Sequence, residues 1–246
     1  MLPLCLCALL AATPAPPVEL RAGSVEPEDT VELDIAGLVA PARAEAGLFL
    51  FGRLSTPARS LRALLLRSTD GGAHWTEVLP EAQHSEVLFV EFAGCEGRAL
   101  VGWSTEGPGE LTLYSSPDCG VTWKRQSTLP KAVWSEWPMA MSWKNGQQGT
   151  VWLVDMNEEK LPARVLTTRD GGRSWRAAKN PPQEPPPASS TESRLVAQGP
   201  SGVRWQVTAD EQVSRVERQE RGAPVQTRAL VPRYWRREKG KLVPTR

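Results

Sequence analysis

The chain carries four carboxylates that could serve as the acid and base of a glycoside hydrolase: Glu91, Glu110, Glu136 and Asp155. Such enzymes place two carboxylates about 5–10 Å apart across the sugar. No motif or spacing in the sequence pairs any two of these residues, and lone acids are typical of a solvated surface. The sequence therefore offers candidates for this chemistry but no catalytic pair.

Histidine chemistry has only two residues to use, His74 and His84. A Ser-His-Asp triad would need one of them, yet His74 falls within a predicted turn, His84 falls within a loop, and no Gly-x-Ser-x-Gly motif lies near either. Two histidines also leave almost no ligands for a zinc ion. We therefore predict no catalytic residue, no metal site and no cofactor.

Composition narrows the class of partner. The 246 residues include 29 Lys and Arg against 28 Asp and Glu, a formal net charge of +1, so bulk charge indicates neither nucleic acid nor a membrane surface as a partner. No apolar run approaches the roughly 20 residues of a transmembrane helix. The length suits one all-β domain with a substantial core.

Both ends of the chain differ from its middle. Residues 2–12 are apolar apart from Pro3, and small residues follow, which predicts a signal peptide over residues 1–15 with its cleavage site left open. We therefore expect an exported protein: secreted, periplasmic or in the cell envelope. Lipid anchoring at Cys5 or Cys7 is less well supported, because neither has a full apolar stretch before it. We expect residues 16–30 to form an acidic linker and residues 231–246 a basic C-terminal tail.

The strongest signal is an internal repeat with the frame Ser/Thr-x-Asp-x-Gly-x-x-Trp. Its aspartates, Asp70, Asp118 and Asp170, follow one another at 48 and 52 residues, the size of a propeller blade. An apolar run precedes each copy, so each copy is predicted to be the turn from one strand into the next. The repeated positions are Ser68, Asp70, Gly72 and Trp75, then Ser116, Asp118, Gly120 and Trp123, then Thr168, Asp170, Gly172 and Trp175.

Each repeated position has a physical role. The aspartate carboxylate can accept hydrogen bonds from backbone N–H groups further along the turn, and the Ser or Thr hydroxyl can add another. The glycine allows a positive φ without a Cβ penalty. The tryptophan buries a large ring at the start of the returning strand.

This frame resembles the Asp-box, or BNR, repeat of sialidases, sortilin-type receptors, some endoglucanases and photosystem assembly factors. The resemblance covers residues 31–230 and implies a β-propeller in which the repeat is a folding motif between the third and fourth strands of a blade. It also implies a ligand site on the opposite face. The sequence departs mildly from the family pattern at His74, where Ser or Thr is usual, and at Cys119, where Gly is common.

The apolar runs divide residues 31–230 into sixteen predicted strands, and hence four blades of four antiparallel strands. Three of these blades carry a repeat. A five-bladed ring with an irregular last blade, or an open array, also fits. Residues 181–190 are rich in proline and cannot form a central strand, so we predict an exposed linker before the last blade.

Sialidase activity is not expected, although the resemblance raises it. Those enzymes use an arginine cluster and a Tyr–Glu pair, whereas this chain has only Tyr114, close to a repeat, and Tyr234, in the basic segment. We therefore favour a non-catalytic binding or assembly module. A glycoside hydrolase with an unrecognised carboxylate pair is the alternative.

The candidate binding residues lie in the loop between the second and third blades. Trp134 and Trp137 flank Glu136 there, and exposed aromatic rings could stack on a glycan or anchor a protein partner. The competing interpretation is that both rings fill space between blades.

Once a signal peptide is set aside, Cys95 and Cys119 remain. An even count in an oxidising compartment allows one disulfide, although two separate thiols are equally consistent with the spacing. If turns 1–2 and 3–4 of a blade begin two strand spacings apart, about 10 Å, the loop residues must lean inward to form the bridge.

Overall fold

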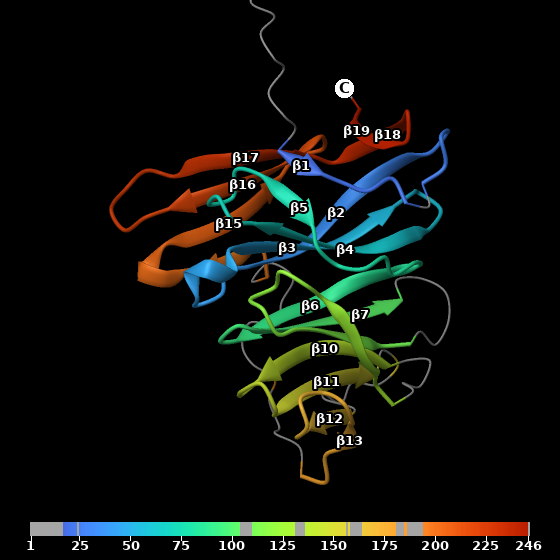
Figure 1. Cartoon of the computed structure of the whole chain (residues 1–246), viewed down its shortest axis with the longest axis vertical. Helices are drawn as coiled ribbons and strands as arrows, with labels where there is room; N and C mark the ends of the chain where they lie inside the picture. Colours follow the sequence, from blue (N-terminus) through green and yellow to red (C-terminus); the bar gives the residue numbers. More distant parts are fainter. Residues whose placement is uncertain are drawn as a thin grey trace, which may run out of the picture.

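The computed structural model describes residues 17–23, 25–103, 110–130, 136–155, 157, 164–180, 185 and 194–245. Within these residues, four sheets each contain four strands that lie side by side in chain order and run antiparallel to their neighbours (Figure 1). We number these sheets first to fourth along the chain. The first sheet contains β2 (Thr30–Val39), β3 (Leu48–Ser55), β4 (Ser60–Ser68) and β5 (Trp75–Glu77), and the second contains β6 (Ser85–Ala93), β7 (Glu96–Trp103), β8 (Thr112–Ser116) and β9 (Lys124–Thr128). The third sheet contains β10 (Glu136–Trp143), β11 (Gly149–Asp155), β12 (Arg164–Thr168) and β13 (Arg176–Ala177). The fourth sheet contains β14 (Val196–Gln198), β15 (Arg204–Ala209), β16 (Val213–Gln219) and β17 (Gln226–Pro232).

Short polar turns connect these strands. In the hairpin between β10 and β11, the Asn145 side chain accepts hydrogen bonds from the backbone N–H groups of Gln147 and Gln148, at 2.9 and 2.8 Å. This local bonding is the usual reason for asparagine in a turn. Each of the first three sheets ends its third strand in one copy of the repeat.

The sheets pack face to face in a row. Three buried clusters join the fourth sheet to the first, the first to the second, and the second to the third. Figure 1 shows this row along the long axis of the molecule, with the third sheet at one end. The first cluster includes Leu33, Leu50 and Trp205, the second Phe49, Val90 and Trp123, and the third Leu100, Val151 and Trp175.

Both segments that flank the predicted domain extend the first sheet. Strand β1 (Val18–Glu19) pairs parallel with β5, and Val25 is fully buried nearby. Strand β18 (Tyr234–Glu238) pairs with β2, and β19 (Lys241–Pro244) completes a hairpin. The structure thus differs from the linker that we expected at residues 16–30 and from the tail that we expected at residues 231–246. Both segments contribute side chains to the core, since Val25 and Trp235 are each 0% exposed.

A buried ion pair holds the N-terminal segment in place. The side chains of Arg62 and Glu77 are 1% and 2% exposed, and they meet at 3.2 Å. Glu77 also accepts hydrogen bonds from the backbone and the side chain of Arg21, while Arg62 donates to the carbonyl groups of Arg21 and Ala22. Because every charge in this cluster is bonded, its burial is tolerated.

The prediction of an all-β chain made of four-stranded antiparallel, blade-like sheets is confirmed. In the described part of the chain, no helix is long and apolar enough to cross a membrane.

Candidate functional site

A cavity of about 400 Å³ lies where the first strands of the first three sheets, β2, β6 and β10, approach one another. Its wall includes Ala36, Glu86, Leu88, Trp137, Met139 and Arg194. Residues near the starts of β6 and β10 form most of this wall. First and third strands of a sheet run in the same direction, so these starts lie at the end opposite the repeated turns.

Three β-bulges shape the cavity. The pairing register shifts between Ile35 and Gly37 in β2, between Val87 and Phe89 in β6, and between Pro138 and Ala140 in β10. The extra residues are Ala36, Leu88 and Met139, one in each sheet, and all three line the cavity. Bulges redirect side chains and are common beside functional sites, so this shared position marks the cavity as a candidate site.

Two charged side chains, Glu86 and Arg194, give the cavity its polarity. Glu86 forms an ion pair with Arg53 at 3.3 Å, and Arg53 also pairs with Asp34 at 3.0 Å. Burial raises the pKa of Glu86, and the Arg53 guanidinium partly offsets this effect. The Arg194 guanidinium lies 4.3 Å from the centre of the Phe89 ring, a cation–π contact, and burial lowers its pKa.

The predicted binding residues separate in the structure. Trp137 lines the cavity, and its 38% exposure places it among the few exposed large apolar residues of the described chain. The Glu136 side chain is 7% exposed and pairs with Arg164 at 2.6 Å, so it serves the packing of the third sheet and does not line the cavity. Trp134 lies outside the described residues.

The four carboxylates considered for glycoside hydrolysis each have a different partner. Glu91 accepts a hydrogen bond from the Trp143 backbone N–H at 2.8 Å, and burial raises its pKa to about 7. Glu110 pairs with Arg125, and Asp155 accepts a hydrogen bond from the Asn157 N–H. None of the four is among the described residues that line the cavity.

The repeated turns are closed by one hydrogen-bond pattern. In the second turn, the Ser116 hydroxyl donates to Asp118 and accepts from the Gly120 N–H, both at 2.8 Å. Asp118 also accepts from the backbone N–H and the hydroxyl of Thr122, at 2.9 and 2.6 Å. The same bonds recur around Asp170, and around Asp70 with the His74 imidazole in place of the hydroxyl.

These bonds alter the acidity of the three aspartates. Burial alone would raise the pKa of Asp118, but the hydrogen bonds from Thr122 and Ser116 outweigh it and lower this pKa to about 2. Asp70 has the same balance, with His74 as the main donor, and a pKa of about 2. Hydrogen bonds from Ser174 and Thr168 lower the pKa of Asp170. The aspartates are therefore ionised structural acceptors.

A disulfide joins Cys95 and Cys119, whose Cα atoms are 4.1 Å apart. Our expectation of a wider gap was wrong because Cys95 directly precedes β7, and β7 lies beside β8, the strand that leads to Cys119. The Cys119 N–H also donates to the Cys95 carbonyl at 2.9 Å. Glu45 lies close to both sulfur atoms, but sulfurs bonded to each other do not act as thiolate ligands for a metal.

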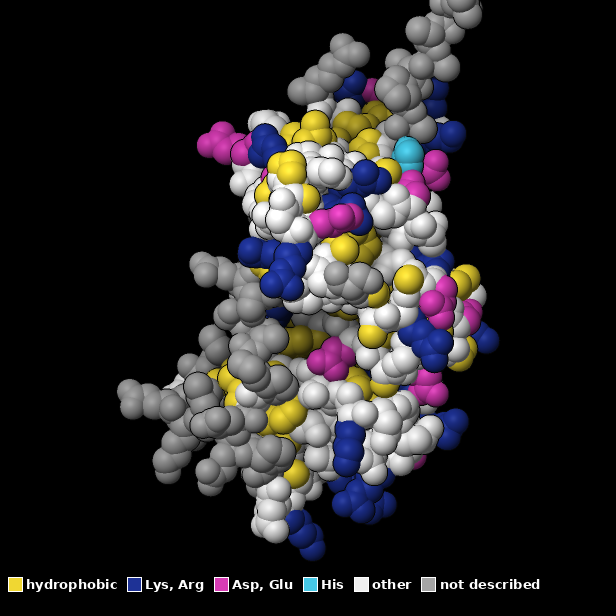
Figure 2. Space-filling model, turned by 90° about the vertical axis from the view of Figure 1, so that its left-hand side faces the viewer, with side chains coloured by type: hydrophobic (Ala, Val, Ile, Leu, Met, Phe, Trp, Pro, Cys, Tyr) yellow, Lys and Arg dark blue, Asp and Glu magenta, His cyan; other side chains and the backbone are white. Residues whose placement is uncertain are grey.

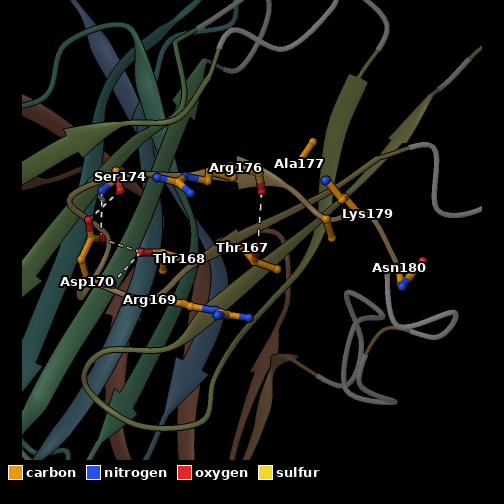
Figure 3. A pocket seen from close by; sticks show the side chains of 10 residues that line it. Thr167, Thr168, Arg169, Asp170, Ser174, Arg176, Ala177, Lys179 and Asn180 are labelled. Atoms are coloured by element: carbon orange, nitrogen blue, oxygen red, sulfur yellow. Dashed lines mark hydrogen bonds between the residues drawn. The ribbon is translucent and has the colours of Figure 1, made fainter.

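A second hollow, of about 680 Å³, lies on the outer face of the third sheet beside the third turn (Figure 3). Thr167, Arg169, Arg176 and Lys179 are among its lining residues. Asp170 is at its margin, with its carboxylate bonded to Thr168 and Ser174.

Sequence reasoning missed the cavity at β2, β6 and β10, because its polar groups Glu86 and Arg194 belong to no motif. A signal was present in the run of four apolar residues from Val87 to Val90. Apolar and polar residues alternate in a strand that buries one face, and a run of four apolar residues departs from this alternation. A bulge causes such a departure, because its extra residue shifts the alternation by one position.

No protein-family model and no curated protein matches the sequence. Among solved structures, the chain is similar to YCF48 bound to D1 peptide, at 18% identity and a TM-score of 0.40, covering 86% of this chain and 58% of that one. It is also similar to the GH74 enzyme of Niastella koreensis, at 17% identity and a TM-score of 0.37, covering 78% of this chain and 24% of that one. A third similarity is to an α-L-arabinanase of Penicillium chrysogenum, at 13% identity and a TM-score of 0.39, covering 78% and 66%. The chain thus spans little more than half of the first of these proteins and about a quarter of the second.

Proposed function

We propose that this protein is an exported, non-catalytic Asp-box β-propeller module that binds a protein or glycan partner in the cell envelope or outside the cell. The four sheets would be its four blades, arranged as an open row. The cavity at β2, β6 and β10 would be its binding site. The observation that carries the proposal is the exposed Trp137 ring at the rim of a cavity that three equivalent bulges shape.

The chemistry of the cavity favours binding. Leu88 and Met139 supply apolar wall, Trp137 supplies an aromatic surface, and Glu86 and Arg194 supply one charge of each sign. Apolar walls with a few fixed polar groups are typical of sites that hold a ligand. An exposed tryptophan beside such a wall is also typical of the residues that dominate interface energetics.

In the proposed module the Asp-box turns would be scaffold. Their aspartates are saturated with hydrogen bonds from their own turn, for example from Ser116 and Thr122 in the second copy. The Cys95–Cys119 disulfide accords with export, because such bonds persist in oxidising compartments.

One observation favours the alternative of a glycoside hydrolase. A carboxyl group with a pKa of about 7, such as Glu91, suits a general acid. However, Glu91 accepts a hydrogen bond from the Trp143 backbone N–H, and it is not among the described residues that line the cavity. The similar solved structures include a peptide complex as well as glycoside hydrolases, so they favour neither function.

Site-specific photo-crosslinking tests the proposal. A photoreactive phenylalanine analogue at Trp137 should yield a discrete adduct when the protein is expressed in its native cells or incubated with their surface glycans. The same analogue at Val225, an exposed apolar residue of the fourth sheet, is the control and should yield none. Equal adducts at both positions, or none at Trp137, would contradict the proposed site. Turnover of aryl glycosides that is lost in Glu91→Gln would instead establish the hydrolase.

A further inference from the structure

The outer face of the third sheet carries four cations that lack acidic partners. Within the described residues, Lys144, Arg169, Arg176 and Lys179 form no ion pair, and they are all exposed. Several arginines of the other three sheets are by contrast paired, as Arg53 with Asp34, Arg125 with Glu110 and Arg215 with Asp210. Figure 2 shows Lys and Arg side chains gathered at the same end of the molecule.

Strand register brings the two arginines, Arg169 and Arg176, to one face. Thr167 pairs with Arg176 across β12 and β13, so both side chains lie on the same side of the sheet. Arg169 follows Thr167 by two residues and shares that side, whereas Leu166 and Trp175 point the other way, into the core.

The cations line two hollows that share lining residues. Arg169, Arg176 and Lys179 line the hollow of about 680 Å³ and come from three successive segments: the third turn, β13 and the residues after β13 (Figure 3). An adjoining hollow of about 340 Å³ shares Arg169 and adds Lys144. Thr167 and Asn180 add a hydroxyl and an amide, groups that also bond to oxyanions.

Asp170, the one carboxylate among the described residues that line these hollows, offsets only one of the four cations. Asp170 accepts hydrogen bonds from Thr168, from the Ser174 N–H and from the Ser174 hydroxyl, so its oxygens are engaged within the turn. The corresponding positions of the other turns carry one cation between them, because Arg169 is matched by Thr69 and Pro117 and Arg176 is matched by Thr76 and Lys124. The cationic face is therefore a property of the third copy and not of the repeat.

We propose that this face is a second binding site, separate from the cavity at β2, β6 and β10, and that it takes an oxyanion of the phosphate type. Arg169 and Arg176 would supply planar guanidinium donors, which match a phosphate group in two-pronged fashion. Lys179 and Lys144 would supply point charges. The phosphate could belong to a small soluble ligand or to a lipid headgroup, since both present the same chemistry.

Titration with inorganic phosphate at low ionic strength tests the site, with amide NMR shifts as the readout. Phosphate should cause saturable shifts around residues 167–180, and chloride at the same ionic strength should not. The double variant Arg169→Gln/Arg176→Gln should weaken binding by about tenfold or more, because each removes a charge-assisted hydrogen-bond donor. Arg204→Gln/Arg221→Gln is the matched control, since both residues are exposed and form no ion pair, Arg204 in β15 and Arg221 in the turn between β16 and β17.

Vesicles distinguish the two sources of phosphate. Flotation with vesicles of phosphatidylcholine alone and with added phosphatidylglycerol should recover the protein only with the anionic lipid if the ligand is a headgroup. Binding of free phosphate without vesicle binding supports a soluble ligand. Absence of saturable phosphate shifts, or equal shifts in the Arg169/Arg176 variant, would overturn the proposal. Vesicle binding without phosphate shifts would also overturn it, because it would show diffuse charge attraction.

Discussion

The Glu91 carboxylate of the second sheet accepts a hydrogen bond from the backbone N–H of Trp143 in the third sheet, at 2.8 Å. This bond crosses the interface between two sheets that also meet through a buried apolar cluster and through a hydrogen bond from Arg98 to the Gly146 carbonyl. Burial raises the pKa of Glu91 to about 7, so its ionisation is unfavourable in the folded protein.

Stability should therefore fall as this group ionises. The folded pKa of Glu91 is above its ordinary value of 4.5, so its contribution is complete below about pH 4.5 and is lost as the pH rises through about 7. Glu91→Gln removes the charge while keeping the acceptor. At about 1.4 kcal/mol per pKa unit, this variant should be more stable than the parent by about 1–3 kcal/mol at pH 8 and equal to it at pH 4. Denaturant unfolding measures both values.

Glu110→Gln, at an exposed ion pair, is the control. Curves of stability against pH that remain parallel for the parent and Glu91→Gln would contradict the account.

The repeated turns should depend on their aspartates. Asp118→Ala removes the acceptor of three hydrogen bonds from Ser116 and Thr122, so we expect a loss of about 1–3 kcal/mol in the free energy of unfolding. Glu211→Ala, in an exposed position, should change it by less than about 0.5 kcal/mol. His74→Thr should be tolerated, because Thr122 already fills that position in the second turn. An Asp118→Ala protein that melts like the parent would show that the turn is not held by its carboxylate.

The Cys95–Cys119 disulfide should stabilise a turn in which one residue has an unfavourable backbone conformation. Cys119 has a φ of +57°, a region that favours glycine. We expect Cys95→Ala/Cys119→Ala to lose about 3 kcal/mol, mainly because an unfolded chain without the crosslink has more freedom. Cys95→Ala/Cys119→Gly should recover about 1 kcal/mol of this, since glycine adopts the same φ without strain. Thermal unfolding of both variants tests the pair, and two free thiols in protein folded under oxidising conditions would reject the bridge.

The Arg62–Glu77 pair should tie down the N-terminal segment. Glu77→Ala leaves the buried Arg62 without its carboxylate, and breaking such a pair costs about 3–5 kcal/mol. Because Glu77 also bonds Arg21, limited proteolysis should cut near residues 17–25 sooner in the variant. A cleavage pattern identical to that of the parent would show that β1 is held by other contacts.

Much of the fold could be predicted because its signals are local. The turns around Asp70, Asp118 and Asp170 are closed by hydrogen bonds within eight residues, so their sequence alone indicates them. Strands between such turns follow from apolar runs. The distance between Cys95 and Cys119 was misjudged because it depends on whether Cys95 lies next to β6 or next to β7. A strand boundary would have to be predicted to within one or two residues to decide this.

The cavity and the ends of the chain depend on distant contacts. Ala36, Leu88 and Met139 meet only because three sheets stack, and no local pattern specifies that meeting. The C-terminal hairpin was missed because its charged residues dominate the composition. Trp235 and Leu242, both buried, were the signal that this segment packs on the core.

Trp137 provides the most direct test of the central claim, which is that the cavity at β2, β6 and β10 binds the partner. Trp137→Ala should lower affinity for the crosslinked partner or glycan by about thirtyfold, the cost of a strong interface residue, and leave the melting temperature nearly unchanged. Trp152→Ala is the aromatic control: its ring is 5% exposed, so the variant should lose about 3–5 kcal/mol of stability and keep its affinity when folded. Unchanged affinity with a lowered melting temperature in Trp137→Ala would contradict the account and make this ring part of the core.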